Sequence, residues 1–194
     1  MESGHVEVLG VQEFGDTARG IEALDAMVKA AAITILEVMT VTPARFVALI
    51  TGDVASVEAS LAAGRAVGRE SLVDELLIQN LHPQVLPALT ASGEEGEWDA
   101  LGIIEAASIT AGIEAGDCAA KRADVRIVEI RADSHMGGRS SVKVIGPLGE
   151  VQAAVAAAVA LVEARGRLVR RVIIPRPHPE IRPFYRASFG GRSR

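Results

Sequence analysis

The sequence predicts an α+β protein in which one small domain occurs twice in tandem. Three observations predict this fold class: the two halves of the chain align, each half alternates strand-like and helix-like segments in the same order, and a polar stretch separates the halves. The aligned blocks are residues 9–33 with 101–125, residues 51–63 with 145–157, and residues 82–87 with 178–183. Three collinear blocks indicate an internal duplication.

The first copy opens with a strand, a helix and a second strand. Residues 8–14 carry the β-branched and aromatic residues typical of a strand. Asp16 or Thr17 can cap a helix that runs to about residue 32, and residues 33–39 form the next strand. The apolar residues at helical spacing, which we expect to form the buried face of this helix, are Ile21, Leu24 and Val28.

A turn, a third strand, a second helix and a fourth strand follow. Pro43 fixes the backbone of the turn at residues 42–45, and Asp53 can cap a helix that runs to residue 66. The inward-facing residues expected on that helix are Val54, Val57 and Leu61. The remaining predicted elements are strands at residues 46–51 and 72–79 and a short last helix opened by Pro83.

The order βαββαβ is the ferredoxin-like plan, in which helices cover one face of an antiparallel sheet. The second copy repeats this order. We therefore expect two domains, at residues 6–90 and 99–183, with a tail at residues 184–194. The linker between them is polar, acidic and contains glycine.

Composition excludes several classes of protein. The net charge of −5 argues against a nucleic-acid partner, which needs a basic face. No segment has the ~20 apolar residues that a membrane span needs, and the polar start of the chain lacks a signal peptide. Cys118 is the only cysteine, so no intramolecular disulfide can form. A cytoplasmic protein is expected.

The sequence offers no catalytic arrangement. Glu13, Asp16, Glu105 and Asp117 do not form a convincing acid pair, and Glu13 and Glu105 recur in both copies as strand residues. There is no phosphate-binding loop, no dinucleotide fingerprint and no convincing Ser/His/Asp set. We therefore expect a protein that is not an enzyme.

Several motifs resemble the BMC domain of bacterial microcompartment shell proteins. They are LGIIE, GIEAGDCAAKRADV, the paired glycines in residues 135–139, IGPLGEVQAAVAAAVA and IIPRPHPEI. Two copies in one chain resemble the tandem, trimer-forming subclass, and LVDELLIQNLHPQVLPAL is similar to its propanediol-utilisation type. The resemblance implies a homotrimer shaped as a pseudohexagonal disc, which tiles edge to edge with other shell proteins.

The resemblance also assigns roles to two groups of residues. Loops after the second strand of each copy would surround a central pore for small polar metabolites. The predicted pore-lining residues are Thr42, Pro43, Ala44, Ser134, His135, Met136, Gly137 and Gly138. The predicted edge residues, which would contact neighbouring discs, are Lys29, Lys121, Arg176 and Asn80, the last being the first-copy counterpart of Arg176.

Alternatives to a plain shell tile remain open. One is a tile that carries a metal or an iron–sulfur cluster on the three-fold axis. Relatives of the propanediol-utilisation type have a cysteine at the position of Thr42, and a hydroxyl is a poor cluster ligand, so we expect no cofactor and no metal site. Three copies of His135 could hold a metal only if their rings converge. Another alternative is a ferredoxin-like module that binds a regulatory ligand, which would leave the edge residues unexplained.

Overall fold

The computed structural model describes residues 6–90, 98–132 and 137–184. In the first copy the elements are β1 (Leu9–Phe14), α1 (Thr17–Ala30), β2 (Thr34–Val41), β3 (Arg45–Thr51), α2 (Val54–Gly68), η1 (Arg69–Ser71), β4 (Leu72–Ile78) and α3 (Val85–Leu89). In the second copy they are β5 (Ala100–Ala106), α4 (Ile109–Arg122), β6 (Arg126–Arg131), β7 (Ser140–Gly146), α5 (Leu148–Ala164), β8 (Leu168–Pro175) and η2 (Pro179–Phe184).

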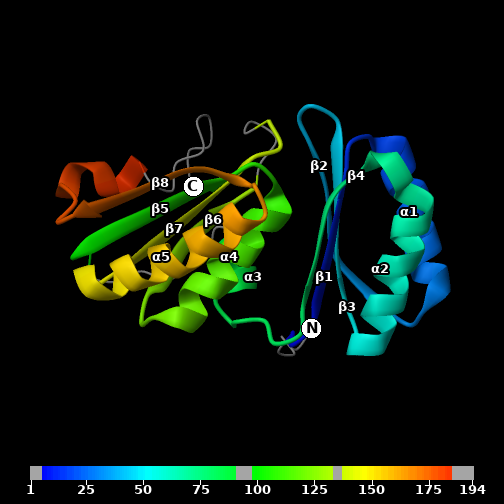
Figure 1. Cartoon of the computed structure of the whole chain (residues 1–194), viewed down its shortest axis with the longest axis horizontal. Coiled ribbons are helices and arrows are strands. Elements are labelled where there is room, and N and C mark those ends of the chain that lie inside the picture. The colour runs from blue at the N-terminus through cyan, green and yellow to red at the C-terminus, as the bar shows by residue number, and fades with distance from the viewer. Residues whose placement is uncertain (1–5, 91–97, 133–136, 185–194) are drawn as a thin grey trace.

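Each copy forms one four-stranded antiparallel sheet. The strand orders are β2-β3-β1-β4 and β6-β7-β5-β8, so corresponding strands occupy corresponding places. Helices α1 and α2 cover the face of the first sheet that points away from the second copy (Figure 1). Both the α+β class and the βαββαβ order predicted from the sequence are confirmed.

The caps predicted for the first two helices are present. The backbone N–H of Arg19 donates to Oδ1 of Asp16 at 2.8 Å, and that of Ser56 donates to Oδ1 of Asp53 at 2.9 Å. Each cap satisfies one of the N–H groups that an α-helix leaves without a partner at its start. The last helix of the first copy begins at Val85, two residues after the predicted Pro83.

Two glycines show that the helices pack equally closely in both copies. A Cβ atom added to Gly10 would lie 2.7 Å from Val57 and 2.8 Å from Ile50, which is too close. Gly102, its counterpart in the second copy, would meet Val155 at 2.6 Å. A side chain at either position would push the second helix of its domain away from the sheet, so both copies need glycine here.

The predicted buried face of α1 is wrong for Ile21 and Val28, whereas Leu24 is half-buried and packs against the core. The residues that α1 buries are Gly20, Ala23 and Met27, whereas Ile21 is 56% exposed and Val28 is 45% exposed. Gly20 allows this packing because the Phe46 ring lies 2.5 Å from where its Cβ would be. The sequence contains two adjacent apolar stripes on this helix. The stripe that packs against the sheet is the one that contains Gly20 and Ala23.

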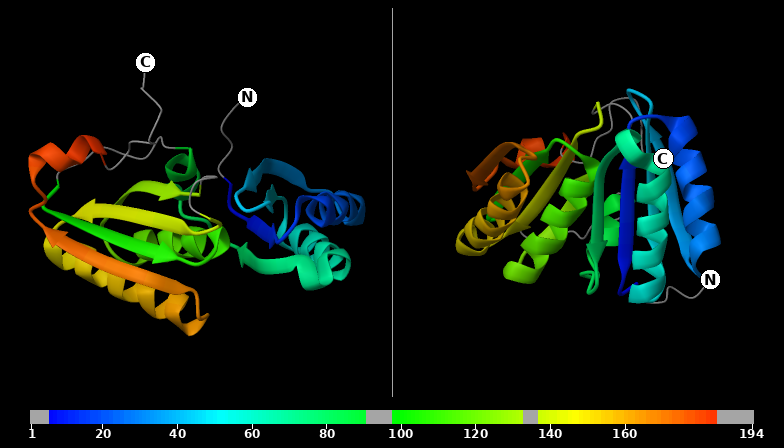
Figure 2. Two further views of the ribbon diagram at one scale, coloured as in Figure 1. Left: turned by 90° about the horizontal axis from the view of Figure 1, so that it is seen from above. Right: turned by 45° about the vertical axis from the view of Figure 1, so that its right-hand side comes forward.

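Helix α4 joins the two copies. It contacts β6 and β7 of its own sheet and also β1 and β4 of the first copy. One continuous core cluster therefore holds residues of both copies, among them Leu9, Val11 and Leu76 from the first and Ile109 and Ile113 from the second. Figure 2 shows the two domains side by side with this junction between them. No helix in the described part of the chain combines the length and apolar character needed to cross a bilayer.

Candidate functional site

The structure brings the two predicted pore loops together. Thr42, Pro43 and Ala44 form the exposed turn between β2 and β3. Arg45, which follows them, donates a hydrogen bond from Nη1 to the carbonyl oxygen of Gly138 at 2.9 Å. Backbone φ angles are positive at three turn residues, Ala44, Gly137 and Gly138. Ser134, His135 and Met136 lie outside the described residues.

Glu13 anchors this junction beneath the loops. Its side chain is fully buried, pairs with Arg45, and accepts backbone N–H bonds from Ile109 at 2.9 Å and Thr110 at 3.4 Å. These N–H groups belong to the first turn of α4, where a carboxylate is favoured by the helix dipole. Burial nevertheless raises the pKa of Glu13, and the Arg45 guanidinium opposes that rise. Glu13 thus ties the sheet of one copy to a helix of the other.

A second ionic cluster between the two copies surrounds Asp74 on β4. The buried Asp74 carboxylate accepts a hydrogen bond from Oγ of Ser108 at 2.5 Å and pairs with Arg165. Arg167 Nε lies 3.5 Å from Oδ2 of Asp74, the oxygen that accepts from Ser108, and Arg165 also pairs with Glu114. The first copy supplies the Asp74 carboxylate, and the second copy supplies both arginines together with Glu114. Sequence reasoning missed this cluster, because its members are far apart in the chain.

Lys121, one of the predicted edge residues, lies beside a third contact between the two copies. Its Nζ is 2.6 Å from Oδ2 of Asp117, and Oδ1 of the same carboxylate accepts the backbone N–H of His82 at 2.8 Å. Lys29 pairs with Asp25 at 2.6 Å in the equivalent way. The Lys29 side chain is 73% exposed and that of Lys121 is 36% exposed. Both lysines therefore project from the last turn of their helices within reach of a neighbouring molecule.

Gln84 makes the fourth junction contact. Its side-chain amide donates to the carbonyl oxygen of Val125 at 3.2 Å and accepts from the N–H of Ile127 at 2.7 Å. These backbone groups belong to the start of β6, the edge strand of the second sheet. One amide side chain thus provides both a donor and an acceptor across the junction.

The remaining predicted edge residues, Asn80 and Arg176, are both exposed and follow the fourth strand of their copies. Arg176 has a positive φ of 47°, and its backbone N–H donates to the carbonyl oxygen of Asp99 at 2.6 Å. This bond fixes the backbone of Arg176 while leaving its guanidinium exposed. The structure therefore presents different side chains at the two equivalent edge positions.

An iron–sulfur cluster at the β2–β3 turn does not fit the residues present. Thr42 offers a hydroxyl where a thiolate would be needed. Cys118 lies half-buried on α4, and burial, with Asp117 and Glu114 nearby, raises the pKa of its thiol. Within residues 6–90, 98–132 and 137–184, no three His, Cys, Asp or Glu side chains are grouped as a metal site would require.

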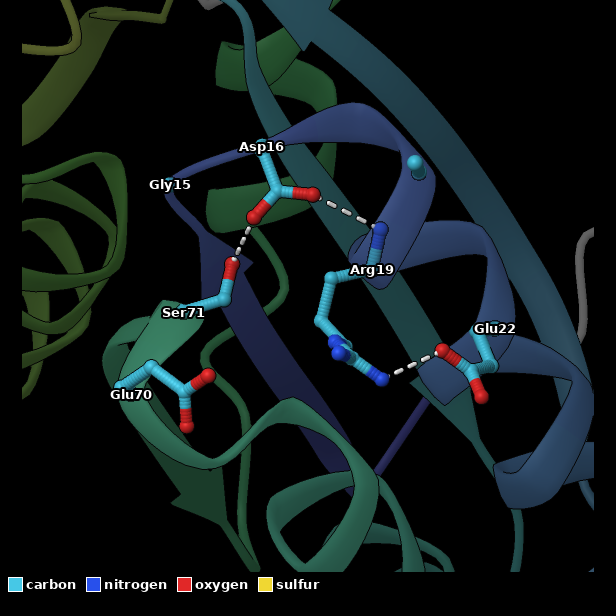
Figure 3. A pocket seen from close by; sticks show the side chains of 7 residues that line it. Gly15, Asp16, Arg19, Glu22, Glu70 and Ser71 are labelled. Atoms are coloured by element: carbon cyan, nitrogen blue, oxygen red, sulfur yellow. Dashed lines mark hydrogen bonds and ion pairs between the residues drawn. The ribbon is translucent and has the colours of Figure 1, made fainter.

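A hollow of about 510 Å³ opens at the start of α1. Its lining consists of Gly15, Asp16, Ala18, Arg19, Glu22, Glu70 and Ser71. Asp16 accepts a hydrogen bond from Oγ of Ser71 at 2.6 Å, and Arg19 pairs with Glu22 at 2.6 Å (Figure 3). The Ser71 hydroxyl and the Arg19 N–H lower the pKa of Asp16. The lining contains three carboxylates and one arginine, so its net charge is negative.

Comparisons with known proteins agree on one family. The BMC domain model matches residues 8–81 and again residues 100–177. The chain is similar to the bacterial microcompartment shell protein PduT of Citrobacter freundii, at 36% identity over 172 residues, which cover 89% of this chain and 94% of that protein. Residues covering 49% of the chain are 36% identical to shell protein EutM of Salmonella typhimurium, over 97% of that protein.

A solved structure extends the similarity to the whole fold. A microcompartment protein from Desulfitobacterium hafniense superimposes with a TM-score of 0.80 at 44% identity, covering 92% of this chain and 99% of that one. The agreement spans both copies and therefore includes their tandem arrangement.

Proposed function

This chain belongs to the BMC domain family, and from that premise we propose that three copies of it close into one ring-shaped tile with a central pore. The protein is a structural component of a bacterial microcompartment shell. Members of this family assemble into oligomeric tiles with other shell proteins. We propose three further points: that the tile contains three chains, that it has a central pore, and that particular residues make its contacts. We also place the two domains at residues 6–90 and 99–183.

The junction between the two copies is the observation that supports a ring. Helix α4 is buried against the first sheet, but its counterpart α1 leaves Ile21 and Val28 exposed. The matching face of the second sheet is also open, since Val172 is 39% exposed whereas its counterpart Leu76 is 9% exposed. Each chain thus carries one helix and one sheet face that are complementary but cannot meet within the chain. Such a head-to-tail contact closes into a ring when its rotation divides a full turn, as the proposed tile requires.

In this ring the pore would be lined by residues 42–44 and 134–138 of every chain. The Arg45 bond to Gly138 supports this, because it holds a loop of each copy at the same end of the junction. The glycines allow loops to crowd around an axis, and the polar lining suits small polar metabolites. We assign the tile no catalytic role.

The trimer is tested by measuring mass and dissociation in solution. We expect sedimentation velocity to give three times the mass of the chain, and Ile21→Asp to shift the species toward folded monomer. The substitution leaves the fold intact, since Ile21 is exposed in the single chain. A wild-type protein that stays monomeric at all concentrations would refute the proposed ring.

Crosslinking tests the pore. In a Cys118→Ser background, Thr42→Cys should be joined into covalent trimers by a trifunctional maleimide with short arms, because three copies of this residue would surround one axis. Dilution below the dissociation concentration should abolish the crosslink. Trimeric protein that yields only monomers after crosslinking would place residue 42 away from the axis.

Electron microscopy tests the edges. Lys121→Ala and Arg176→Ala should reduce the formation of sheets while the trimer mass stays unchanged, because both side chains project from the disc. Sheets that form as readily as in the wild type would reject the edge role.

A further inference from the structure

The two copies carry opposite charges at one equivalent position of their sheets. In the first copy Glu13 pairs in register with Asp74, and in the second copy Glu105 pairs in register with Arg170. Arg170 therefore occupies the place of Asp74. Asp74 is buried in the junction within the chain, whereas Arg170 is exposed on the open face of β8.

The charges are also reversed on the helical side of the junction. Asp74 meets Ser108, Arg165 and Arg167, of which Ser108 is the N-cap of α4 and the arginines directly precede β8. In the first copy the corresponding N-cap is Asp16.

The residues that precede β4 belong to the same surface of the first copy as Asp16. They include Arg69, Glu70 and Ser71, so Ser71 stands where the second copy has Arg167. Arg69 keeps the positive charge of Arg165, but Asp16 and Glu70 add two carboxylates that the second copy lacks. These two residues line the hollow at the start of α1, where Figure 3 shows them on either side of Ser71.

We propose that Arg170 of one copy of the chain enters this hollow in the next copy and pairs with Asp16 and Glu70. This rests on the proposed ring, in which α1 packs against the open sheet of the neighbouring chain as α4 packs against the first sheet. In the junction within a chain, the sheet then contributes the anion, Asp74. In the junction between chains, the sheet contributes a cation, Arg170. Asp16 suits the role because Ser71 and the Arg19 N–H hold its carboxylate in place facing the hollow.

This reversal determines which domains can meet. If the second sheet packed against a second-copy helix, Arg170 would face Arg165 and Arg167. If the first sheet packed against a first-copy helix, Asp74 would face Asp16. Both wrong pairings place like charges together, whereas the alternating arrangement pairs opposite charges at every junction. The partner of each domain is therefore the other kind of domain, which keeps the two copies alternating around the ring.

Charge reversal at Arg170 tests the proposal directly. Arg170→Asp should raise the concentration at which the trimer half-dissociates about tenfold or more, because it places a carboxylate against Asp16 and Glu70. The matched control is Arg171→Asp, the same change at the next residue of β8, whose side chain points to the opposite face of the sheet. It should leave the trimer near the wild-type value.

A rescue variant separates the specific pairing from general damage. Arg170→Asp combined with Asp16→Ser and Glu70→Arg removes both carboxylates that face residue 170 in the proposed junction and places a cation opposite the new aspartate. The helix keeps a serine cap, and the trimer should return toward wild-type stability. Circular dichroism confirms that each variant is folded before its mass is measured by sedimentation.

The outcomes distinguish this inference from the proposed ring. Wild-type protein that is not trimeric refutes the ring itself. A trimeric wild type whose Arg170→Asp variant dissociates no more readily than Arg171→Asp refutes only the ion pair. Failure of the triple variant to recover, while Arg170→Asp alone is folded and monomeric, also overturns the pairing assigned here.

Discussion

Helices α1 and α4 share a sequence motif but lie in different surroundings. Ile113 on α4 is fully buried against the first sheet, and its counterpart Ile21 on α1 is 56% exposed. The same side chain at the same place of the same fold is thus part of a core in one copy and part of a surface in the other. Duplication thus created one internal junction, between α4 and the first sheet. It left the two equivalent surfaces, α1 and the open face of the second sheet, without a partner domain in the single chain.

The largest effect should come from the buried member of this pair. Ile113→Ala removes most of a fully buried side chain, so the free energy of unfolding should fall by roughly 2–5 kcal/mol. Ile21→Ala should change the unfolding of the isolated chain by no more than about 0.5 kcal/mol and instead weaken the trimer. Denaturant unfolding at several protein concentrations separates the two, because only the Ile21 effect depends on concentration.

The ionic cluster within the chain gives the next largest effect. Asp74→Ala leaves Arg165 and Arg167 without their shared carboxylate, so stability should fall by roughly 2–3 kcal/mol, less than for a fully buried pair because both arginines are partly exposed. Arg170→Ala, at the equivalent position of the second sheet, should leave the unfolding of the isolated chain unchanged. Equal losses for the two variants would show that the junctions are not distinct in the way described.

A smaller effect is expected where the two copies differ by one polar side chain. Gln84 donates to Val125 and accepts from Ile127, but its counterpart in the second copy is Glu180, whose carboxylate has no donor for a backbone carbonyl. Glu180→Gln should therefore strengthen the contact between chains by about 1 kcal/mol per junction. A dissociation concentration that stays the same or rises would show that Glu180 does not repeat the Gln84 contact.

The smallest expected effect is a difference in pH dependence. Burial raises the folded pKa of Glu13 above its ordinary 4.5, so the folded state holds this proton more tightly than the unfolded state. Stability of the wild type relative to Glu13→Gln should therefore fall as pH rises from 4.5 through the folded pKa, and stay level above it.

Asp16 should show the opposite slope, because its folded pKa is lowered from 3.8. Its contribution is present above pH 3.8 and is lost as the pH falls through the folded pKa. Unfolding curves between pH 2 and 7 for wild type, Glu13→Gln and Asp16→Ser measure both. If the stability contributions of Glu13 and Asp16 changed with pH in the same direction, the raised pKa of Glu13 and the lowered pKa of Asp16 would be contradicted.

Local patterns predicted the elements well because each depends on neighbours in the sequence. Asp16 and Asp53 cap the helices that follow them, and Val57 and Leu61 are buried as their spacing predicts. Ile21 and Val28 were wrongly predicted to be buried on α1, because helical spacing alone does not distinguish the stripe of Ile21 from that of Met27. The close approach of Phe46 to Gly20, which decides between them, is a tertiary contact.

The candidate site was predicted only in outline. The family resemblance located the pore loops and the edge residues, which stay predictions for Thr42, His135 and Arg176. It gave no role to Asp74, although the change from Asp74 to Arg170 is visible in the aligned sequence once the strand register is known. The role of this charge difference is visible only when the partners of Asp74 are located, and they come from two separate segments of the second copy.

The sequence by itself determined that the chain contains one domain twice, which family that domain resembles, and where most strands and helices lie. These are properties of local periodicity and of aligned motifs, and they need no knowledge of packing. Only the tertiary structure decided which copy of each repeated residue is buried. A tandem pair has one internal junction, so Glu13 and Ile113 lie inside it, while Glu105 and Ile21 occupy the equivalent places outside it. That asymmetry arises from geometry, because identical residues differ only in what the chain places against them.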